Sequence, residues 1–244
     1  MSSFVIKIIA VISMLFDHTR VFFPDTFPME FRVIGRIAFP LFVFLVAEGF
    51  HHTRSPIKFL LRLLAFALIS EPIFDAAQPW DGWENINFLS HTNIFYTLFL
   101  GGASIAAYKY VQARWNVTSL AILPAVGFAA LGHLLTADYG AMGVLFIFAL
   151  YITKKTQPRL LLWVMAGMCL LLWHNVLWDL AMGVRYAAIT YVMVGATVLA
   201  VPIAAAYNGK RGINTPWVKW GFYVFYPLHL AALGVIASLP HILK

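Results

Sequence analysis

The chain has 244 residues, of which 61% are hydrophobic and only 11% are charged, and its mean hydropathy is +0.81. An average soluble domain has about 25% charged residues, so the composition excludes a soluble protein and leaves room for about ten membrane spans at most. The single cysteine, Cys169, excludes a disulfide framework and a multi-cysteine metal site. The net charge of +7 is explained by membrane topology rather than by binding to nucleic acid, because Lys and Arg lie in short connections beside apolar runs.

Nine apolar runs predict an all-α bundle of about nine transmembrane helices in a single membrane domain over residues 1–244. The first run, 4–23, is interpreted as a retained helix, because the polar stretch 17–20 follows it without a small-residue cleavage site. The other runs lie near 36–50, 57–76, 93–111, 118–136, 139–153, 159–174, 186–206 and 217–239. The runs 139–153 and 159–174 are short for a span, which makes them candidates for tilted or re-entrant segments.

The positive-inside rule gives the orientation. With the N-terminus in the cytoplasm, the inner connections carry basic residues and no acidic ones: Arg54, Lys58, Lys109, Arg114, Lys154, Lys155, Arg159, Lys210 and Arg211. The outer connections hold Asp25, Glu30, Asp81, Glu84, Asp138 and Asp179, against Arg32, Arg36, Arg185 and Lys244. We therefore predict a cytoplasmic N-terminus and an external C-terminus.

Ionisable side chains within spans are costly unless they are paired or hydrated, so each is a functional candidate. A rise of about 1.5 Å per residue places several of them at a similar depth in the outer half of the membrane. They are Asp17, His18, Arg36, Glu71, His133 and His174. We expect these residues to converge in one outer-half pocket.

A histidine beside a carboxylate suits general-base catalysis, because the carboxylate fixes the imidazole tautomer and raises its basicity. His18 would be the base and Asp17 its partner, while Arg36 stabilises an anionic intermediate and Glu71 positions an amine or relays its proton. The alternatives are that Asp17 is a structural cap or an ion-pair partner of Arg20 or Arg36. A transporter would use Asp17, His18 and Glu71 as a proton path.

A second group gathers at the cytoplasmic ends of the second and third spans: Glu48, His51, His52, Arg54, Lys58 and Arg62. Lys58 and Arg62 are four residues apart and share a helix face. Such a cluster suits phosphate recognition, although basic residues at this position are more often a topology signal. Glu48 and His51 resemble half of a carboxylate-bridged metal site whose other half is missing, so no metal is expected.

Several segments resemble the TraX family of conjugative-pilin acetylases. They are KIIAVISMLFDH (7–18), RVIGRIAFPLFVFLVAEGF (32–50), HTR (52–54), RLLAFALISEPIFD (62–75), DYG (138–140) and FYVFYPLHL (222–230). The resemblance covers nearly the whole chain. One departure is the stretch TNIFYTL (92–98), which differs from the usual family pattern but keeps Asn93 and Thr97.

The resemblance implies a multi-pass protein of the bacterial inner membrane that transfers acetyl from acetyl-CoA to the amino terminus of pilin or of another exported peptide, with no nucleic acid involved. The motif positions that carry over are Asp17, His18, Arg36, Glu48, His52, Arg54, Arg62, Glu71, Asp75, Asp138 and His229. We assign catalysis to His18, Asp17, Glu71 and Arg36. Donor binding is assigned to Arg54, Lys58, Arg62, His52 and Glu48, with His133, Asp138 and His229 as further candidates.

In the predicted mechanism, the inner cluster holds the donor's phosphates and the pantetheine arm extends toward His18, which acts as a base or as an acetyl relay. Two other functions would use the same residues. They are a proton-coupled transporter and a non-catalytic pilin assembly factor.

Overall fold

A computed structural model describes residues 1–77 and 91–242. In these residues all regular structure is helical, apart from an isolated bridge between Thr92 and Ala137. The prediction of an all-α protein is therefore confirmed. The predicted outer residues Asp81 and Glu84 lie outside the described residues.

The chain divides into two compact units, each built from segments that are distant in sequence. The first comprises Met1–Phe42, Ile73–Ile86 and Ala166–Lys244, and the second Val43–Pro72 and Asn87–Met165. The chain passes from one unit to the other within three helices: α3 (Ala38–His52), α4 (Pro56–Ala77) and α8 (Leu161–Leu171). The single domain over residues 1–244 stays a prediction.

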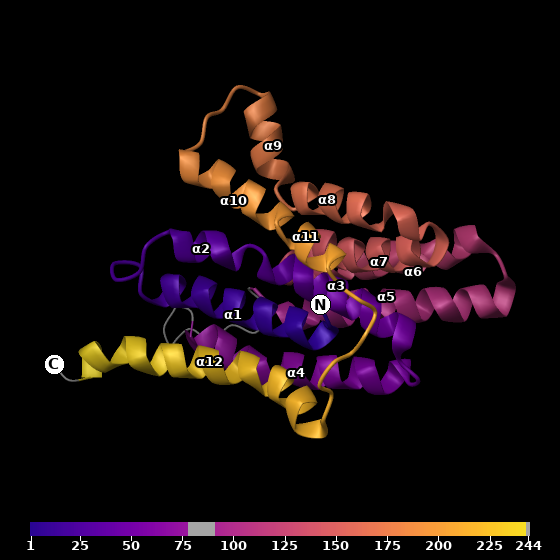
Figure 1. The fold of residues 1–244 in the computed structure, drawn as a ribbon, viewed down its shortest axis with the longest axis horizontal. Helices are drawn as coiled ribbons and strands as arrows, with labels where there is room; N and C mark the ends of the chain where they lie inside the picture. Colours follow the sequence, from indigo (N-terminus) through magenta and orange to yellow (C-terminus); the bar gives the residue numbers. More distant parts are fainter. Residues whose placement is uncertain (78–90, 243–244) are drawn as a thin grey trace. The chain divides into compact units, whose positions relative to one another are not determined.

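The first unit contains α1 (Ser3–Phe22), α2 (Glu30–Gly35), α9 (His174–Ala181), α10 (Ala188–Val198), α11 (Ala200–Ala205) and α12 (Pro216–Ile242). Helix α1 packs against α2 and α12, as Figure 1 shows. The amide of Ser3 donates to the carbonyl of Lys210 at 2.9 Å, just before α12 begins. Because Phe4 lies against Phe222 and His18 against His229, α1 and α12 run in the same direction.

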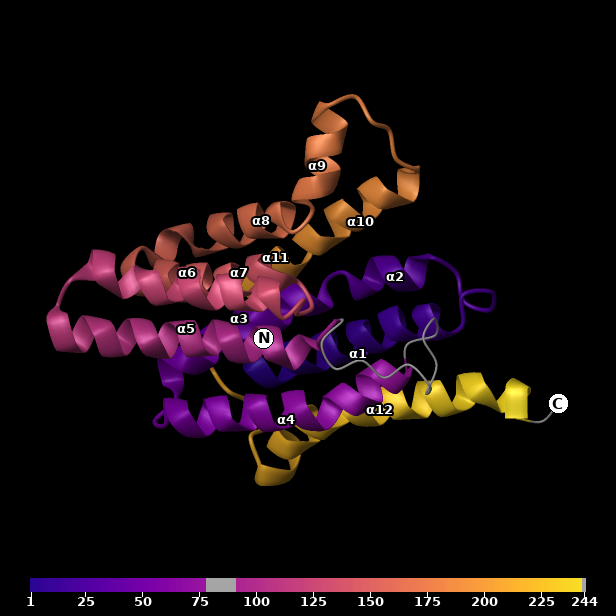
Figure 2. The same cartoon turned by 180° about the vertical axis from the view of Figure 1, so that it is seen from behind.

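The second unit contains α5 (Ile94–Trp115), α6 (Thr118–Leu134) and α7 (Gly140–Thr156), which lie side by side in Figure 2. Two glycines of α5 allow close packing, since a Cβ on Gly101 would collide with Ile147 and one on Gly102 would lie 2.8 Å from Phe50. The α3 and α4 parts of the chain complete this unit.

The two ends of the second unit differ in charge. At one end, Lys155 of α7 donates to Gln112 of α5 at 3.0 Å, and Lys154 pairs with Glu48. At the other end, the amide of Asp138 donates to the carbonyl of Thr92 at 2.9 Å. Basic residues thus gather where α3, α5 and α7 end.

Helices occupy all nine ranges predicted as spans. Within the described residues, four are long and apolar enough to cross a membrane: Glu30–His52, Ile94–Trp115, Ala188–Ala205 and Pro216–Leu239. A fifth candidate is the pair Pro158–Leu171 and His174–Ala181, which is bent by 69° and has the form of a broken span or re-entrant loop. This agrees with the short run at 159–174. The protein therefore carries membrane-spanning helices, while the count of nine and the orientation stay predictions.

Two residues predicted to lie in a connection are helical instead. Glu30 and Arg32 belong to α2, which joins α3 in one candidate span. An ion pair with Asp17 provides a counter-charge for Arg32 in this candidate span.

Candidate functional site

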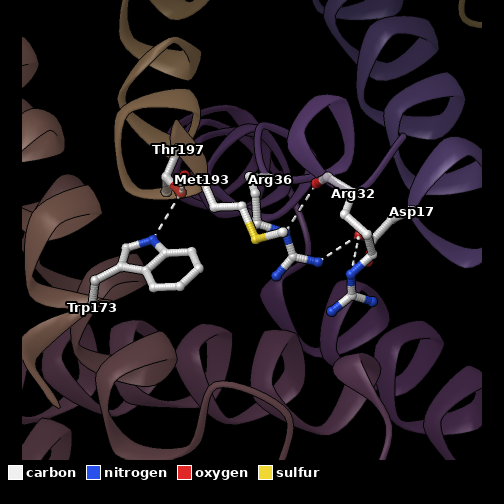
Figure 3. A network of polar contacts seen from close by, with 6 residues as sticks. All are labelled: Asp17, Arg32, Arg36, Trp173, Met193 and Thr197. Carbon is white, nitrogen blue, oxygen red and sulfur yellow. Dashed lines mark hydrogen bonds and ion pairs between the residues drawn. The ribbon is translucent and has the colours of Figure 1, made fainter. Parts of the chain in front are cut away.

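Asp17 of α1 lies between two arginines of the α2 region, as Figure 3 shows. Its Oδ1 is 2.5 Å from Nη2 of Arg36 and 3.5 Å from Nε of Arg32. Only 15% of the Asp17 side chain and 16% of the Arg36 side chain are exposed, so this pair is largely removed from solvent. Of the alternatives given for Asp17, the structure therefore shows the ion pair with Arg36.

His18 follows Asp17 but contacts a different group. Its Nδ1 lies 2.6 Å from Nε2 of His229 on α12, and the two rings are stacked with centroids 4.9 Å apart. Nδ1 of His229 lies 2.8 Å from the carbonyl oxygen of Phe225. The expected contact between Asp17 and His18 is thus replaced by a pair of imidazoles, because adjacent residues of a helix do not face each other.

Glu71 is the centre of a buried polar cluster in the second unit. Its Oε2 accepts hydrogen bonds from the backbone N–H of Asn93, at 3.1 Å, and from the Asn93 side-chain amide. The same amide donates to the carbonyl of Ala67 at 2.8 Å, while Oδ1 of Asn93 accepts from the N–H of Phe95 and caps α5. Glu71 therefore holds α4 to the first turn of α5.

Asp138 lies in the turn between α6 and α7, at the same end of this unit as Asn93. Its backbone carbonyl accepts a hydrogen bond from the Thr97 hydroxyl, and its N–H donates to Thr92. The turn is tight, with φ of +46° at Thr136 and +61° at Tyr139. The family positions Asn93, Thr97 and Asp138 thus meet at one place.

The remaining candidates for the outer pocket are placed differently. Asp75, which the family resemblance singles out and the predicted pocket does not include, is buried near the end of α4. His133 of α6 and His174 of α9 are both exposed within the described chain. Among the candidates within spans, Glu48, Glu71, Asp75 and His229 are therefore buried, and His18 is half-buried against His229.

Glu48 is the buried acid of the inner cluster, with 5% of its side chain exposed. Its carboxylate accepts from Nε2 of His52 at 2.7 Å and pairs with Lys154 of α7. His51 instead stacks on the ring of Tyr151, with centroids 4.5 Å apart. The Lys154 ammonium therefore offsets the charge of Glu48, and His52 gives its carboxylate a second polar contact.

The basic residues of this cluster differ in exposure. Arg54 and Lys58 are exposed, whereas Arg62 is half-buried with its guanidinium 5.7 Å from the Phe59 ring. Nε of Arg62 is buried and has no hydrogen-bond partner among the described residues. The cluster thus presents two exposed cations and one partly desolvated cation at the start of α4.

Sequence reasoning missed three groups in these clusters. Arg32 lies one turn before Arg36, a spacing that could have revealed their shared contact with Asp17. Lys154 was noted only for topology, and nothing in one sequence links it to Glu48, 106 residues away. The Phe225 carbonyl is a backbone group and has no residue-type signal.

Comparisons with known proteins cover almost the whole chain. A family model described as TraX protein matches residues 2–237. A Dichelobacter nodosus protein, described as a probable fimbrial assembly protein FimC of serogroup H1, is 29% identical over 242 residues, which are 95% of this chain and 94% of that protein. Protein TraX of Escherichia coli is 29% identical over 240 residues, covering 96% of this chain and 86% of that protein. No solved structure matches.

Proposed function

Because the chain belongs to the TraX family, we propose that it is an integral membrane acetyltransferase. In this proposal it transfers an acetyl group from acetyl-CoA to the amine of an exported peptide, and the acceptor is the N-terminus of a pilin subunit. A curated relative named as a fimbrial assembly protein supports a pilin-related partner. The protein acts in the bacterial inner membrane.

The observation that carries the proposal is the contact between His18 and His229, at 2.6 Å, beside the ion pair of Asp17 with Arg36. His18 is half-buried, and an imidazole whose ring is held by a hydrogen bond is the kind of group that removes a proton during catalysis. Asp17 holds the Arg36 guanidinium, which can stabilise negative charge on an oxygen. These residues fit a transfer reaction with an anionic intermediate.

The proposed step begins when the lone pair of the acceptor nitrogen attacks the thioester carbonyl carbon. A C–N bond forms, the carbonyl electron pair moves onto oxygen, and Arg36 stabilises that oxyanion. The amine gives a proton to His18 as the carbonyl re-forms and the C–S bond breaks. The thiolate leaves and then takes the proton from His18, so the products are the acetylated amine and free CoA.

The basic end of the second unit supports a cytoplasmic donor. We assign the donor's phosphates to Arg54, Lys58 and Arg62, since charge-assisted contacts to phosphate are strong. Glu48 contacts both Lys154 and His52, and these contacts hold the end of α3 against the end of α7.

The same features support nine spans with the N-terminus inside. Helices α1 and α12 run in the same direction, which is what an odd number of spans requires. Lys210 and Arg211 lie against the start of α1, so the N-terminus and this basic segment share one side. By the positive-inside rule, these basic residues support a cytoplasmic position for that side.

The test is mass spectrometry of the pilin amino terminus from cells with the wild-type gene, without it, and with His18→Ala. We expect acetylation only with the wild-type gene. Purified His18→Ala protein, folded and inserted, should turn over about 10²- to 10⁴-fold more slowly than wild type. Acetylation that persists without the gene would overturn the proposal, and full turnover by His18→Ala would remove His18 as the base.

A further inference from the structure

Three groups form a continuous line between α1 and α12 in the first unit. Nδ1 of His18 lies 2.6 Å from Nε2 of His229, and Nδ1 of His229 lies 2.8 Å from the carbonyl oxygen of Phe225. His229 is 6% exposed and stacks on the Phe225 ring, with centroids 4.9 Å apart. Tyr226 meets both imidazoles edge-on, so the rings are held on more than one side.

The line has a direction, because a carbonyl oxygen can only accept a hydrogen bond. Nδ1 of His229 must therefore carry a hydrogen and donate a hydrogen bond to the carbonyl oxygen of Phe225. In a neutral imidazole the other nitrogen is then an acceptor, so Nε2 of His229 accepts. The donor to it is Nδ1–H of His18.

We infer that His229 is the positioning residue that fixes His18 as its Nδ1–H tautomer and leaves Nε2 of His18 as the basic nitrogen. This inference rests on the proposed function for its catalytic meaning. His229 takes the place that a carboxylate holds in a His–Asp pair, with the Phe225 carbonyl as the third member. Within the described residues, no hydrogen bond to Nε2 of His18 competes with a substrate proton.

A neutral partner has a different chemical consequence from a carboxylate. When Nε2 of His18 takes a proton from the acceptor amine, the positive charge is stabilised by the Nε2 lone pair of His229 and, beyond it, by the Phe225 carbonyl dipole. The polarised hydrogen bonds of such a chain strengthen one another. The proton stays on His18 until the leaving thiolate takes it, so no net transfer along the line is needed.

Two substitutions of His229 separate positioning from packing. In His229→Gln, the side-chain oxygen can occupy the place of Nε2 and still accept from His18. In His229→Leu, volume is roughly kept but the acceptor is lost. We expect His229→Leu to lower kcat about 100-fold with KM within about two-fold of wild type, and His229→Gln to restore kcat to within about ten-fold of wild type.

Phe4→Leu is the matched control, because it removes another ring contact between α1 and α12, the one with Phe222, and touches neither histidine. We expect its kcat to stay within about three-fold of wild type, although its thermal stability should fall, since a ring contact between the two helices is lost. If His229→Gln and His229→Leu had equal kcat per folded molecule, His229 would be a packing residue and the inference would be wrong.

A readout independent of activity is ¹⁵N NMR of protein labelled at the histidine rings, with signals assigned from the His18→Ala and His229→Leu variants. The wild-type protein should show His18 and His229 protonated at Nδ1 and unprotonated at Nε2. In His229→Leu the His18 ring should change toward the Nε2–H form. An Nε2–H His18 in the wild-type protein would overturn the inference even if acetylation is observed. The expected NMR pattern without acetylation would overturn only the proposed function.

Discussion

At Gly35 the backbone of α2 lies directly against the side chain of Asp17. A Cβ at Gly35 would lie 2.7 Å from the carboxylate carbon of Asp17 and closer still to its Cβ, which real structures do not allow. The atoms in the way are at the base of the side chain, so a rotamer change cannot clear them. The glycine therefore lets the Asp17 carboxylate reach Arg36.

Gly35→Ala should destabilise the protein by about 1–3 kcal/mol, because the α1–α2 contact must open to make room. Gly195→Ala in α10 is the matched control, since a Cβ there meets nothing within 4 Å. We expect the control to be neutral or stabilising by up to about 1 kcal/mol, as alanine favours helix more than glycine does. Thermal unfolding in detergent measures both, and equal melting temperatures for the two variants would contradict the packing argument.

Residue types at the site could be predicted from the sequence, but apart from the Asp17–Arg36 pair, which was one of the alternatives, most of their partners could not. Asp17 and His18 were expected to act together because they are adjacent. On a helix, neighbours point about 100° apart, and each of these residues reaches a different element. The contact between Glu48 and His52 could be predicted from their spacing, because residues four apart on one helix lie on the same face.

At the scale of the elements, Asn93 joins a helix cap to a buried acid. Oδ1 of Asn93 accepts a hydrogen bond from the backbone N–H of Phe95 at 2.9 Å, while the side-chain amide and backbone N–H of Asn93 donate to Glu71. Capping alone would make Asp an equal replacement for Asn. The contact with Glu71 predicts the opposite.

Asn93→Asp keeps the cap but removes both side-chain donations and brings a second carboxylate to Glu71. We expect it to lower stability by about 2 kcal/mol or more, at least as much as Asn93→Ala. Ser2→Ala, which removes the exposed cap of α1, should cost about 1 kcal/mol or less. Melting temperatures in detergent test this order, and a wild-type value for Asn93→Asp would contradict the role given to the amide.

Helix positions could be predicted well because a membrane span needs a long apolar run, and hydropathy alone reveals such runs. The break between α8 and α9, around Trp173, was indicated only by the short length of the run 159–174. The break where α10 gives way to α11, at Leu199, could not be predicted, because it lies inside a run that is apolar on every face. Where all faces are apolar, periodicity gives no signal of bending. The break near Leu199 has one local cause, since Pro202 cannot donate to the carbonyl of Val198.

At the scale of the whole molecule, charge is segregated within each unit. In the first unit Lys210 and Arg211 lie at the start of α1, and Asp25 follows its end. In the second unit Lys154 and Lys155 lie at the end of α7, and Asp138 precedes its start. Since cytoplasmic loops carry the excess of Lys and Arg, each unit independently predicts which of its ends faces the cytoplasm.

Cysteine labelling tests both units in the same orientation experiment. The native Cys169 is fully buried, so single cysteines in a Cys169→Ala background report their own exposure. We expect cysteines at Asp25 and His91 to react with an impermeant thiol reagent added outside intact cells. Cysteines at Lys210 and Lys155 should react only after the membrane is opened.

All four positions are exposed in the structure, so shielding in intact cells reports the membrane and not the fold. Reaction at Lys210 or Lys155 from outside would reverse the orientation of the unit that contains it. Reaction at Lys155 would also remove the cytoplasmic donor from the proposed reaction, because acetyl-CoA could not reach Arg54, Lys58 and Arg62 of the same unit. If labelling is as expected and pilin is acetylated, the acetyl group must enter the protein at the basic end of the second unit, on the cytoplasmic side. It must then be transferred to an amine on the external side.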